Sequence, residues 1–135
     1  NYTEADVRAA ARELTGWRDL DYRNEQRADI AVEFRPARHD TTNKTFSASY
    51  QNTVIRGRTG PNAGNEELAD LIDMILRQPE AARFICRKLY RWLVNHDITP
   101  AVETDFIEPL AQVFRQSGYE IRPVLAALFA STHFY

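Results

Sequence analysis

The first apolar residues of the chain recur with a helical period. Positions i, i+3, i+4 and i+7 of one helical face are occupied by Val7, Ala10, Ala11 and Leu14. Thr3 can cap such a helix, and Asp6 places a negative charge in its first turn, where the helix dipole favours it. Gly16 can adopt the left-handed conformation that often ends a helix. The pattern predicts a helix within residues 1–17 that carries one apolar stripe.

A period of two follows, which is typical of a half-buried strand that ends before a proline. The alternating apolar residues are Ala28, Ile30, Val32 and Phe34. The polar residues 18–27 before them are expected to form a loop. Residues 38–43 have the composition of a turn, and the alternation resumes in residues 46–50. We therefore predict a β-hairpin within residues 28–56, of two strands, or of three if residues 53–55 also pair.

The remainder of the chain has helical spacing of its apolar residues. Four further helices are expected to begin near Asn65, Pro79, Pro100 and Pro123. Pro109 should kink the fourth helix of the chain or move its start to Thr104, and Gly118 should end it. Residues expected in the core include Leu71, Leu89, Trp92, Phe106, Phe114 and Phe129.

These elements predict a mainly α fold, a five-helix bundle-like domain with an inserted β-hairpin. Residues 1–135 are expected to form a single domain: a helix in residues 1–17, the hairpin insert in residues 28–56 and a helical bundle in residues 65–132. The joints between the later helices are only a few residues long, which favours antiparallel neighbours.

Composition and charge exclude several classes of protein. The formal net charge is −2, so the chain lacks the strongly positive field that binding to nucleic acid requires. The single cysteine, Cys86, excludes an internal disulfide and a cysteine-based zinc cluster, and we interpret it as a small core residue. No apolar run approaches the roughly 18 residues needed to span a bilayer. The first residues lack a signal peptide, and the abrupt ends suggest a fragment of a longer chain.

Several stretches resemble one bacterial family, Domain of Unknown Function 1800. The matching segments are Tyr2–Val7, Leu14–Trp17, Phe34 with His39-Asp40 and Lys44, Ala82–Tyr90, Phe114-Arg115 and Ser117–Leu125. They follow the order of the family over nearly the whole chain. In one departure, the family usually has a Leu-Gly pair near Ser47-Ala48, so the hairpin turn is expected to differ here.

The resemblance implies a fragment from the C-terminal half of a longer bacterial protein, and it makes an exported location the expectation. It implies no activity and no cofactor. The partner it suggests is the remainder of the parent chain or another protein, and the oligomeric state is left open.

His39, Asp40 and Lys44 form the first candidate site, on the predicted turn of the hairpin. A histidine beside a carboxylate can act as a general base or metal ligand, and a lysine nearby can hold an anion. The alternative is structural: Asp40 forms an Asx-turn, and His39 caps the hairpin or packs against it. Three histidines in the whole chain are few for a metal site, so no metal is predicted.

His96-Asp97 is a second pair of this kind, and it resembles the dipeptide of metal-dependent phosphohydrolases. No further histidine precedes either pair at helical spacing, so the match lacks its structural context. A positive charge on His96 would suit the end of the third helix, which is the structural alternative.

A basic stripe is the third candidate, formed by Arg83, Arg87 and Arg91 at intervals of four with Lys88 beside them. It can bind an anion or an acidic partner surface. Alternatively, it is a solvated face whose arginines pair with nearby acids.

The first hypothesis of function is therefore a helical binding or scaffolding module of a larger exported protein. The second is part of a hydrolase-like active site with His39 as base and Asp40 orienting it. A binding module should expose an apolar patch, whereas an enzyme should place His39 in a concave pocket with further polar groups.

Overall fold

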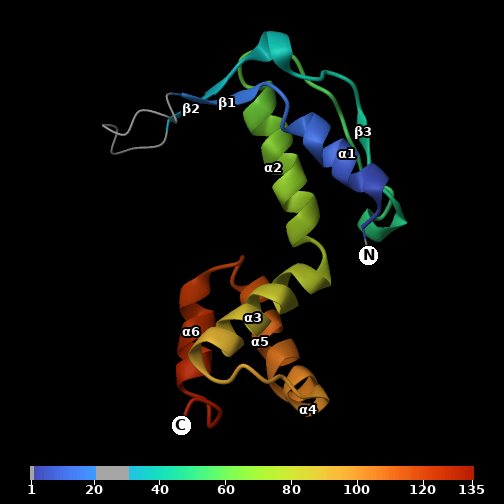
Figure 1. The fold of residues 1–135 in the computed structure, drawn as a ribbon. Helices are drawn as coiled ribbons and strands as arrows, with labels where there is room; N and C mark the ends of the chain where they lie inside the picture. Colours follow the sequence, from blue (N-terminus) through green and yellow to red (C-terminus); the bar gives the residue numbers. More distant parts are fainter. Residues whose placement is uncertain (1, 21–30) are drawn as a thin grey trace. The chain divides into compact units, whose positions relative to one another are not determined.

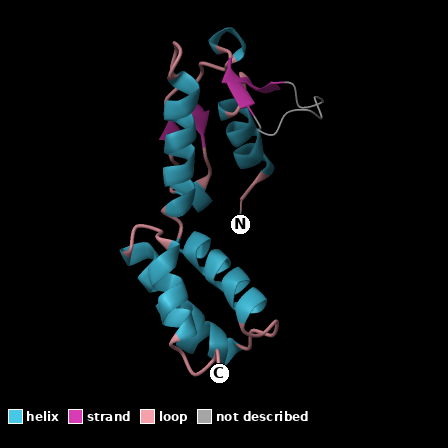
Figure 2. Ribbon diagram, turned by 90° about the vertical axis from the view of Figure 1, so that its left-hand side faces the viewer, coloured by secondary structure: helices cyan, strands magenta, loops and turns pink. Residues whose placement is uncertain are grey.

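The computed structural model describes residues 2–20 and 31–135 (Figure 1). The helices are α1 (Glu4–Glu13), α2 (Ala63–Leu76), α3 (Pro79–Leu93), α4 (Pro100–Val102), α5 (Glu108–Gln116) and α6 (Ile121–Phe129). The strands are β1 (Trp17–Leu20), β2 (Ala31–Phe34), β3 (Lys44–Thr45) and β4 (Val54–Ile55). The predicted fold class, mainly α with small β-hairpins, is confirmed (Figure 2).

Contacts divide the chain into two compact units, residues 1–75 and residues 76–135, which we call the N-terminal and C-terminal units. Each has its own cluster of buried apolar side chains. The single domain expected over residues 1–135 stays a prediction. Among the residues that the structure describes, no helix combines the length and apolar character needed to cross a membrane.

The helix α1 begins where the sequence predicts. Thr3 Oγ1 accepts a hydrogen bond from the Asp6 amide, and Asp6 Oδ2 accepts one of 2.6 Å from the Thr3 amide. This reciprocal capping satisfies two amides that the first turn leaves without helical partners. The face that α1 buries in the unit carries Asp6, Ala9 and Glu13. The apolar stripe lies on a different face, where Val7 is 52% and Leu14 46% exposed.

The strands pair differently from the predicted hairpin. The β1 strand pairs antiparallel with β2, from Trp17 opposite Phe34 to Leu20 opposite Ala31. The β3 strand pairs with β4, which confirms a short strand within residues 53–55. The expected loop over residues 18–27 is therefore wrong at its start, and its remainder lies outside the described residues, as do Ala28 and Ile30 of the expected strand.

Residues 46–50 do not form the second hairpin strand that their alternation predicts. Ala48–Tyr50 form a 3₁₀ turn, which Ser47 caps by accepting a hydrogen bond from the Ser49 amide. Gln51 and Asn52 then take the left-handed conformation, with φ of 59° and 53°. This tight reversal brings β4 back onto β3, and the Phe46 and Tyr50 rings pack edge to face, 5.8 Å apart.

Two helices pack against these strands to form the core of the N-terminal unit. The β3 strand runs beside α1 (Figure 1), and α1 and α2 both contribute side chains to one core. The core side chains are Ala9, Phe46, Ile55, Leu71 and Met74. The α2 helix begins at Ala63, two residues before the predicted cap at Asn65.

The C-terminal unit is built from α3, α5 and α6 (Figure 2). The fourth predicted helix is interrupted before Pro109 by a π-helical segment, Glu103–Ile107. A π-helical segment is a recognised cause of a helix kink. It precedes Pro109, which has no backbone N–H to donate to the helix. The α6 helix begins at Ile121, two residues before Pro123.

The buried faces of this unit are rotated from those predicted. The α3 helix buries Ala82, Cys86 and Tyr90, whereas Leu89 only flanks the core. Trp92, predicted in the core, is 82% exposed, because it lies off this face. Phe114 is buried as predicted, and Phe106 packs at the edge of the core. Phe129 remains 40% exposed.

Candidate functional site

Three buried ionisable side chains meet in the N-terminal unit, and we call them the ionic cluster: His39, Lys44 and Glu67. The side chains of Lys44 and Glu67 are fully buried, and that of His39 is 1% exposed. Lys44 Nζ donates to Glu67 Oε2, and the other oxygen of Glu67 lies 3.0 Å from His39 Nε2. The structure thus brings His39 and Lys44 together, as the sequence suggested, but around an acid that sequence reasoning missed.

His39 is held from both sides of its ring. Nδ1 lies 3.0 Å from the carbonyl oxygen of Thr15, which can only accept a hydrogen bond, so Nδ1 carries a hydrogen. Nε2 faces the Glu67 carboxylate, and the Phe34 ring packs edge-on against the imidazole at 5.2 Å. Acceptor oxygens thus face both nitrogens of the ring.

Asp40 does not orient His39. Its carboxylate accepts hydrogen bonds from Arg12 Nε at 2.7 Å and from the Thr42 amide at 2.8 Å. These donors hold the pKa of Asp40 well below its ordinary value. The bond to the amide two residues on is an Asx-turn, the structural alternative stated for this residue. The acid–base pair suggested by the sequence is therefore not assembled in the described structure.

Glu67 remains ionised although it is buried. Burial raises the pKa of Glu67, but His39, Lys44 and the Arg58 amide together outweigh it and hold the pKa below its ordinary value. The Arg58 amide donates to Glu67 Oε1 at 2.6 Å. Glu67 could have been found from the sequence, because it lies four residues before the core residue Leu71 and so occupies a core-facing position of α2.

Glu13 is a second buried acid that the sequence reasoning missed. Its side chain is fully buried, and both carboxyl oxygens lack a hydrogen-bond partner among the described residues. Burial, and then the charge of Glu67, raise the pKa of Glu13 to about 7. The available signal was its position one turn after Ala9 on the buried face of α1.

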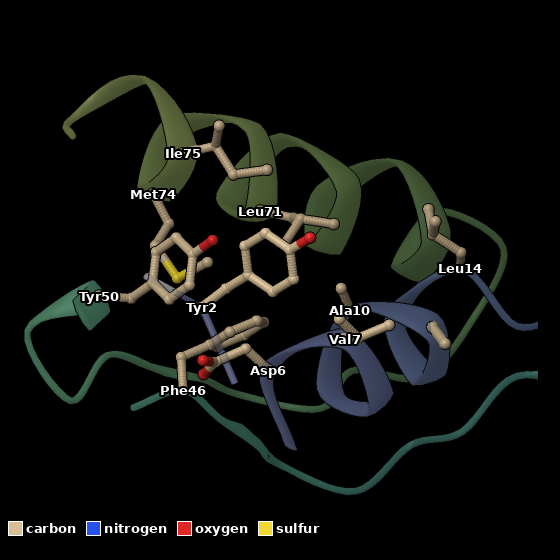
Figure 3. Close-up of a pocket in the computed structure, with 11 residues that line it drawn as sticks. Tyr2, Asp6, Val7, Ala10, Leu14, Phe46, Tyr50, Leu71, Met74 and Ile75 are labelled. Atoms are coloured by element: carbon tan, nitrogen blue, oxygen red, sulfur yellow. The ribbon is translucent and has the colours of Figure 1, made fainter. Parts of the chain in front are cut away.

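A groove of about 390 Å³ runs between α1 and α2, and we call it the α1–α2 groove (Figure 3). Its lining is almost wholly apolar and consists of Tyr2, Asp6, Val7, Ala10, Ala11, Leu14, Phe46, Tyr50, Leu71, Met74 and Ile75. Every residue of the predicted apolar stripe is among them. The stripe of α1 therefore faces the groove rather than the packed interior.

The one acid that lines the groove is already fully engaged. Burial raises the pKa of Asp6, but donors from Ser47 and Thr3 outweigh it and lower the pKa to about 2. The Ser47 amide donates to Oδ1 at 2.6 Å, and the Ser47 hydroxyl to Oδ2 at 2.8 Å. Asp6 thus forms part of the wall of the groove, but its carboxylate is already used by hydrogen bonds within the unit.

The basic stripe in the C-terminal unit is largely neutralised by acids. Arg83 donates to Glu108, and Arg87 pairs with Glu103 through two nitrogens. These pairs line a depression of about 290 Å³. Lys88 lies over the Phe84 ring, 5.0 Å from its centre, and Arg91 is exposed on the same helix. An anion would have to compete with the carboxylates for Arg83 and Arg87.

The other candidate residues stand apart. His96 and Asp97 are exposed in the segment after α3, where His96 Nε2 lies 3.4 Å from Asp97 Oδ1. Within the described part of the chain, no three His, Cys, Asp or Glu side chains are grouped so as to hold a metal ion. Cys86 is buried in the core of the C-terminal unit, and burial raises the pKa of its thiol to about 11, which suits an inert core residue.

Comparison with models of protein families identifies a match for this chain. The model of a family described as "Protein of unknown function (DUF1800)" matches residues 1–135, the whole chain. Neither the curated proteins nor the solved structures contain a match.

Proposed function

This chain belongs to the DUF1800 family of proteins of unknown function, and we propose that its N-terminal unit is a protein-binding module whose α1–α2 groove holds an amphipathic helix of a partner protein. The observation that carries the proposal is the orientation of α1. This helix buries the side chains of Asp6 and Glu13 and leaves Val7 and Leu14 half exposed on the groove.

This orientation is the reverse of what burial energetics favour for a helix with no partner. Full burial of one valine or leucine side chain is worth about 1.5–3 kcal/mol, whereas burial of the Glu13 carboxyl group, which has no hydrogen-bond partner among the described residues, costs free energy. A second apolar surface that covers the stripe would bury Val7 and Leu14, and so supply the stabilisation that this orientation otherwise lacks.

The shape of the groove favours a helix as the occupant. Two of its walls are the helices α1 and α2, with Phe46 and Tyr50 beside them, and the α1 residues that line it recur at i, i+3, i+4 and i+7 (Figure 3). A third amphipathic helix placed along such a stripe completes the packing of a small helical bundle. The half-exposed Ile75 of α2 extends the same apolar surface on the opposite wall.

The test is a substitution that puts a charge on the groove. Val7→Asp should weaken the binding of designed amphipathic helical peptides at least about tenfold, because a free-energy loss of about 1.4 kcal/mol is enough for that change. Val54→Asp is the matched control, since Val54 is 50% exposed, against 52% for Val7, and lies outside the groove. Isothermal titration of the same peptide panel against both variants measures the difference. Equal affinities of the two variants for every peptide would contradict the proposal.

The hydrolase alternative has less support. Its base would be His39, whose side chain is 1% exposed, and its orienting acid would be Asp40, which pairs with Arg12. Neither residue lines the α1–α2 groove. No observation on the described residues favours this second function.

A further inference from the structure

Glu13 is a buried acid placed where its charge would act on the wall of the groove. It lies on the buried face of α1, outside the apolar stripe, and neither carboxyl oxygen has a hydrogen-bond partner among the described residues. A neutral carboxyl group tolerates such surroundings far better than a carboxylate, because the charged form loses its hydration without replacement. The packing of α1 therefore suits the protonated form.

Charged groups surround Glu13 from each element packed on this face of α1. Glu67 and Asp70 of α2 oppose its ionisation, whereas Lys44 of β3 and Arg58 in the segment before α2 favour it. Lys44 is already engaged by Glu67, and Arg58 by Asp70 at 2.7 Å and by Glu66 at 3.2 Å. The imidazole of His39 lies against the carboxylate of Glu67, and Asp40 is paired with Arg12. The two cations whose charges favour ionisation of Glu13, Lys44 and Arg58, are therefore already paired with other acids.

We propose that Glu13 makes the α1–α2 groove pH-dependent: with its carboxyl group protonated, α1 stays packed on β3 and α2, and with the carboxyl group ionised, α1 moves and the groove loses its apolar wall. The inference rests on the proposed function, because it concerns regulation of the same groove. The molecule should hold an apolar partner in mildly acidic solution and release it in mildly alkaline solution.

The sign follows from the two states of the carboxyl group. In the unfolded chain the pKa of Glu13 has its ordinary value of 4.5, and in the folded unit it is raised to about 7. The proton therefore binds the folded unit more tightly, and the stability it contributes is lost as the pH rises through 7. The protonated fraction falls from about nine-tenths at pH 6 to about one-tenth at pH 8, so the apparent Kd of a ligand that needs this form rises about tenfold.

The experiment measures how a neutral apolar dye, N-phenyl-1-naphthylamine, binds to the purified protein at pH 6 and pH 8 and equal ionic strength. The dye does not titrate in this range, so a change in its Kd reports the protein. The parent should bind about tenfold more weakly at pH 8, whereas Glu13→Gln should bind equally at both values, because an amide stays neutral. Val7→Asp should bind weakly at both.

Each outcome separates the inference from the proposed function. A Glu13→Gln variant that keeps the pH dependence of the parent, or a parent without any, overturns the role of Glu13 and leaves the groove untouched. A Val7→Asp variant that binds the dye as the parent does overturns the groove itself. If Glu13→Gln does not fold, hydrogen exchange of the α1 amides in the parent decides: after correction for intrinsic rates, unchanged protection at pH 6 and pH 8 refutes the inference.

Discussion

At the scale of single residues, the N-terminal unit is defined by buried charges. Lys44 and Glu67 are fully buried, and each depends on the other for compensation of its charge. The Arg58 amide and the Asp40 carbonyl oxygen complete their hydrogen bonds. Such a pair need not add net stability, but the loss of one member leaves an uncompensated charge in the interior.

Lys44→Met is therefore expected to destabilise the unit strongly. Removal of one partner of a buried pair costs about 3–5 kcal/mol, which urea unfolding followed by circular dichroism would measure. The control is Arg8→Met, which breaks the exposed pair of Arg8 with Glu4 and should change the unfolding free energy by less than about 0.5 kcal/mol. Similar losses in both variants would show that Lys44 is not held as described.

At the scale of elements, Asp6 joins the start of α1 to the turn that reverses the chain between β3 and β4. It caps its own helix through Thr3 and accepts two hydrogen bonds from Ser47, forty-one residues later in the sequence. A helix cap is a local feature, but these bonds also determine where the turn lies against the helix. One carboxylate thus fixes one end of the α1–α2 groove.

Asp6 should also govern part of the acid sensitivity of the unit. Its pKa is lowered from 3.8 to about 2, so the folded unit binds this proton less tightly than the unfolded chain does. The stability that Asp6 contributes is present above pH 4 and is lost as the pH falls through 2. Asp6→Asn should be less stable at pH 7 and should flatten the decline between pH 4 and pH 2. Glu4→Gln, in the same turn but exposed, should keep the decline of the parent in an acid titration of the unfolding free energy.

At the scale of the whole molecule, the features described above are distributed over two units with separate cores. The groove and the buried acids belong to residues 1–75, and the arginine–glutamate pairs belong to residues 76–135. Leu128 and Val124 of α6 are fully buried in the second core, together with Ile107 and Ala111. Nothing in the proposed function requires a residue of the C-terminal unit.

Leu128→Ala should therefore affect the C-terminal unit alone. The cavity it leaves is expected to cost about 2–5 kcal/mol, seen as faster hydrogen exchange in α3, α5 and α6. The amides of α1 and the dye affinity of the groove should stay as in the parent. Faster exchange of α1 as well would instead support the single cooperative domain that the sequence suggested for residues 1–135.

Local signals in the sequence predicted much of the helical structure. Thr3 starts α1, Pro79 starts α3, and α5 ends just before Gly118, because caps, prolines and glycines act within one turn of their own position. The disturbance before Pro109 follows from its missing donor. By contrast, the alternation in residues 46–50 was misleading, because a period of two does not say which segment, if any, will pair with the strand.

The candidate site shows the same division between what local sequence predicts and what only the folded chain decides. His39 and Lys44 could be singled out by residue type, but only the folded chain brings them to Glu67, twenty-three positions beyond Lys44, and turns Asp40 towards Arg12. The apolar stripe of α1 could also be found from spacing. Its exposure could not, because spacing shows that a face is apolar and does not show what covers it.

The sequence by itself thus determined the helical character of the chain, the ends of several helices and the apolar stripe, since these depend on neighbours within a few residues. Tertiary structure alone decided that α1 buries Asp6 and Glu13, that the stripe lines a groove, and that an acid on α2 pairs with Lys44 and His39. The reason is physical: burial and charge pairing depend on segments distant in sequence, and their free energies exist only once those segments are packed together.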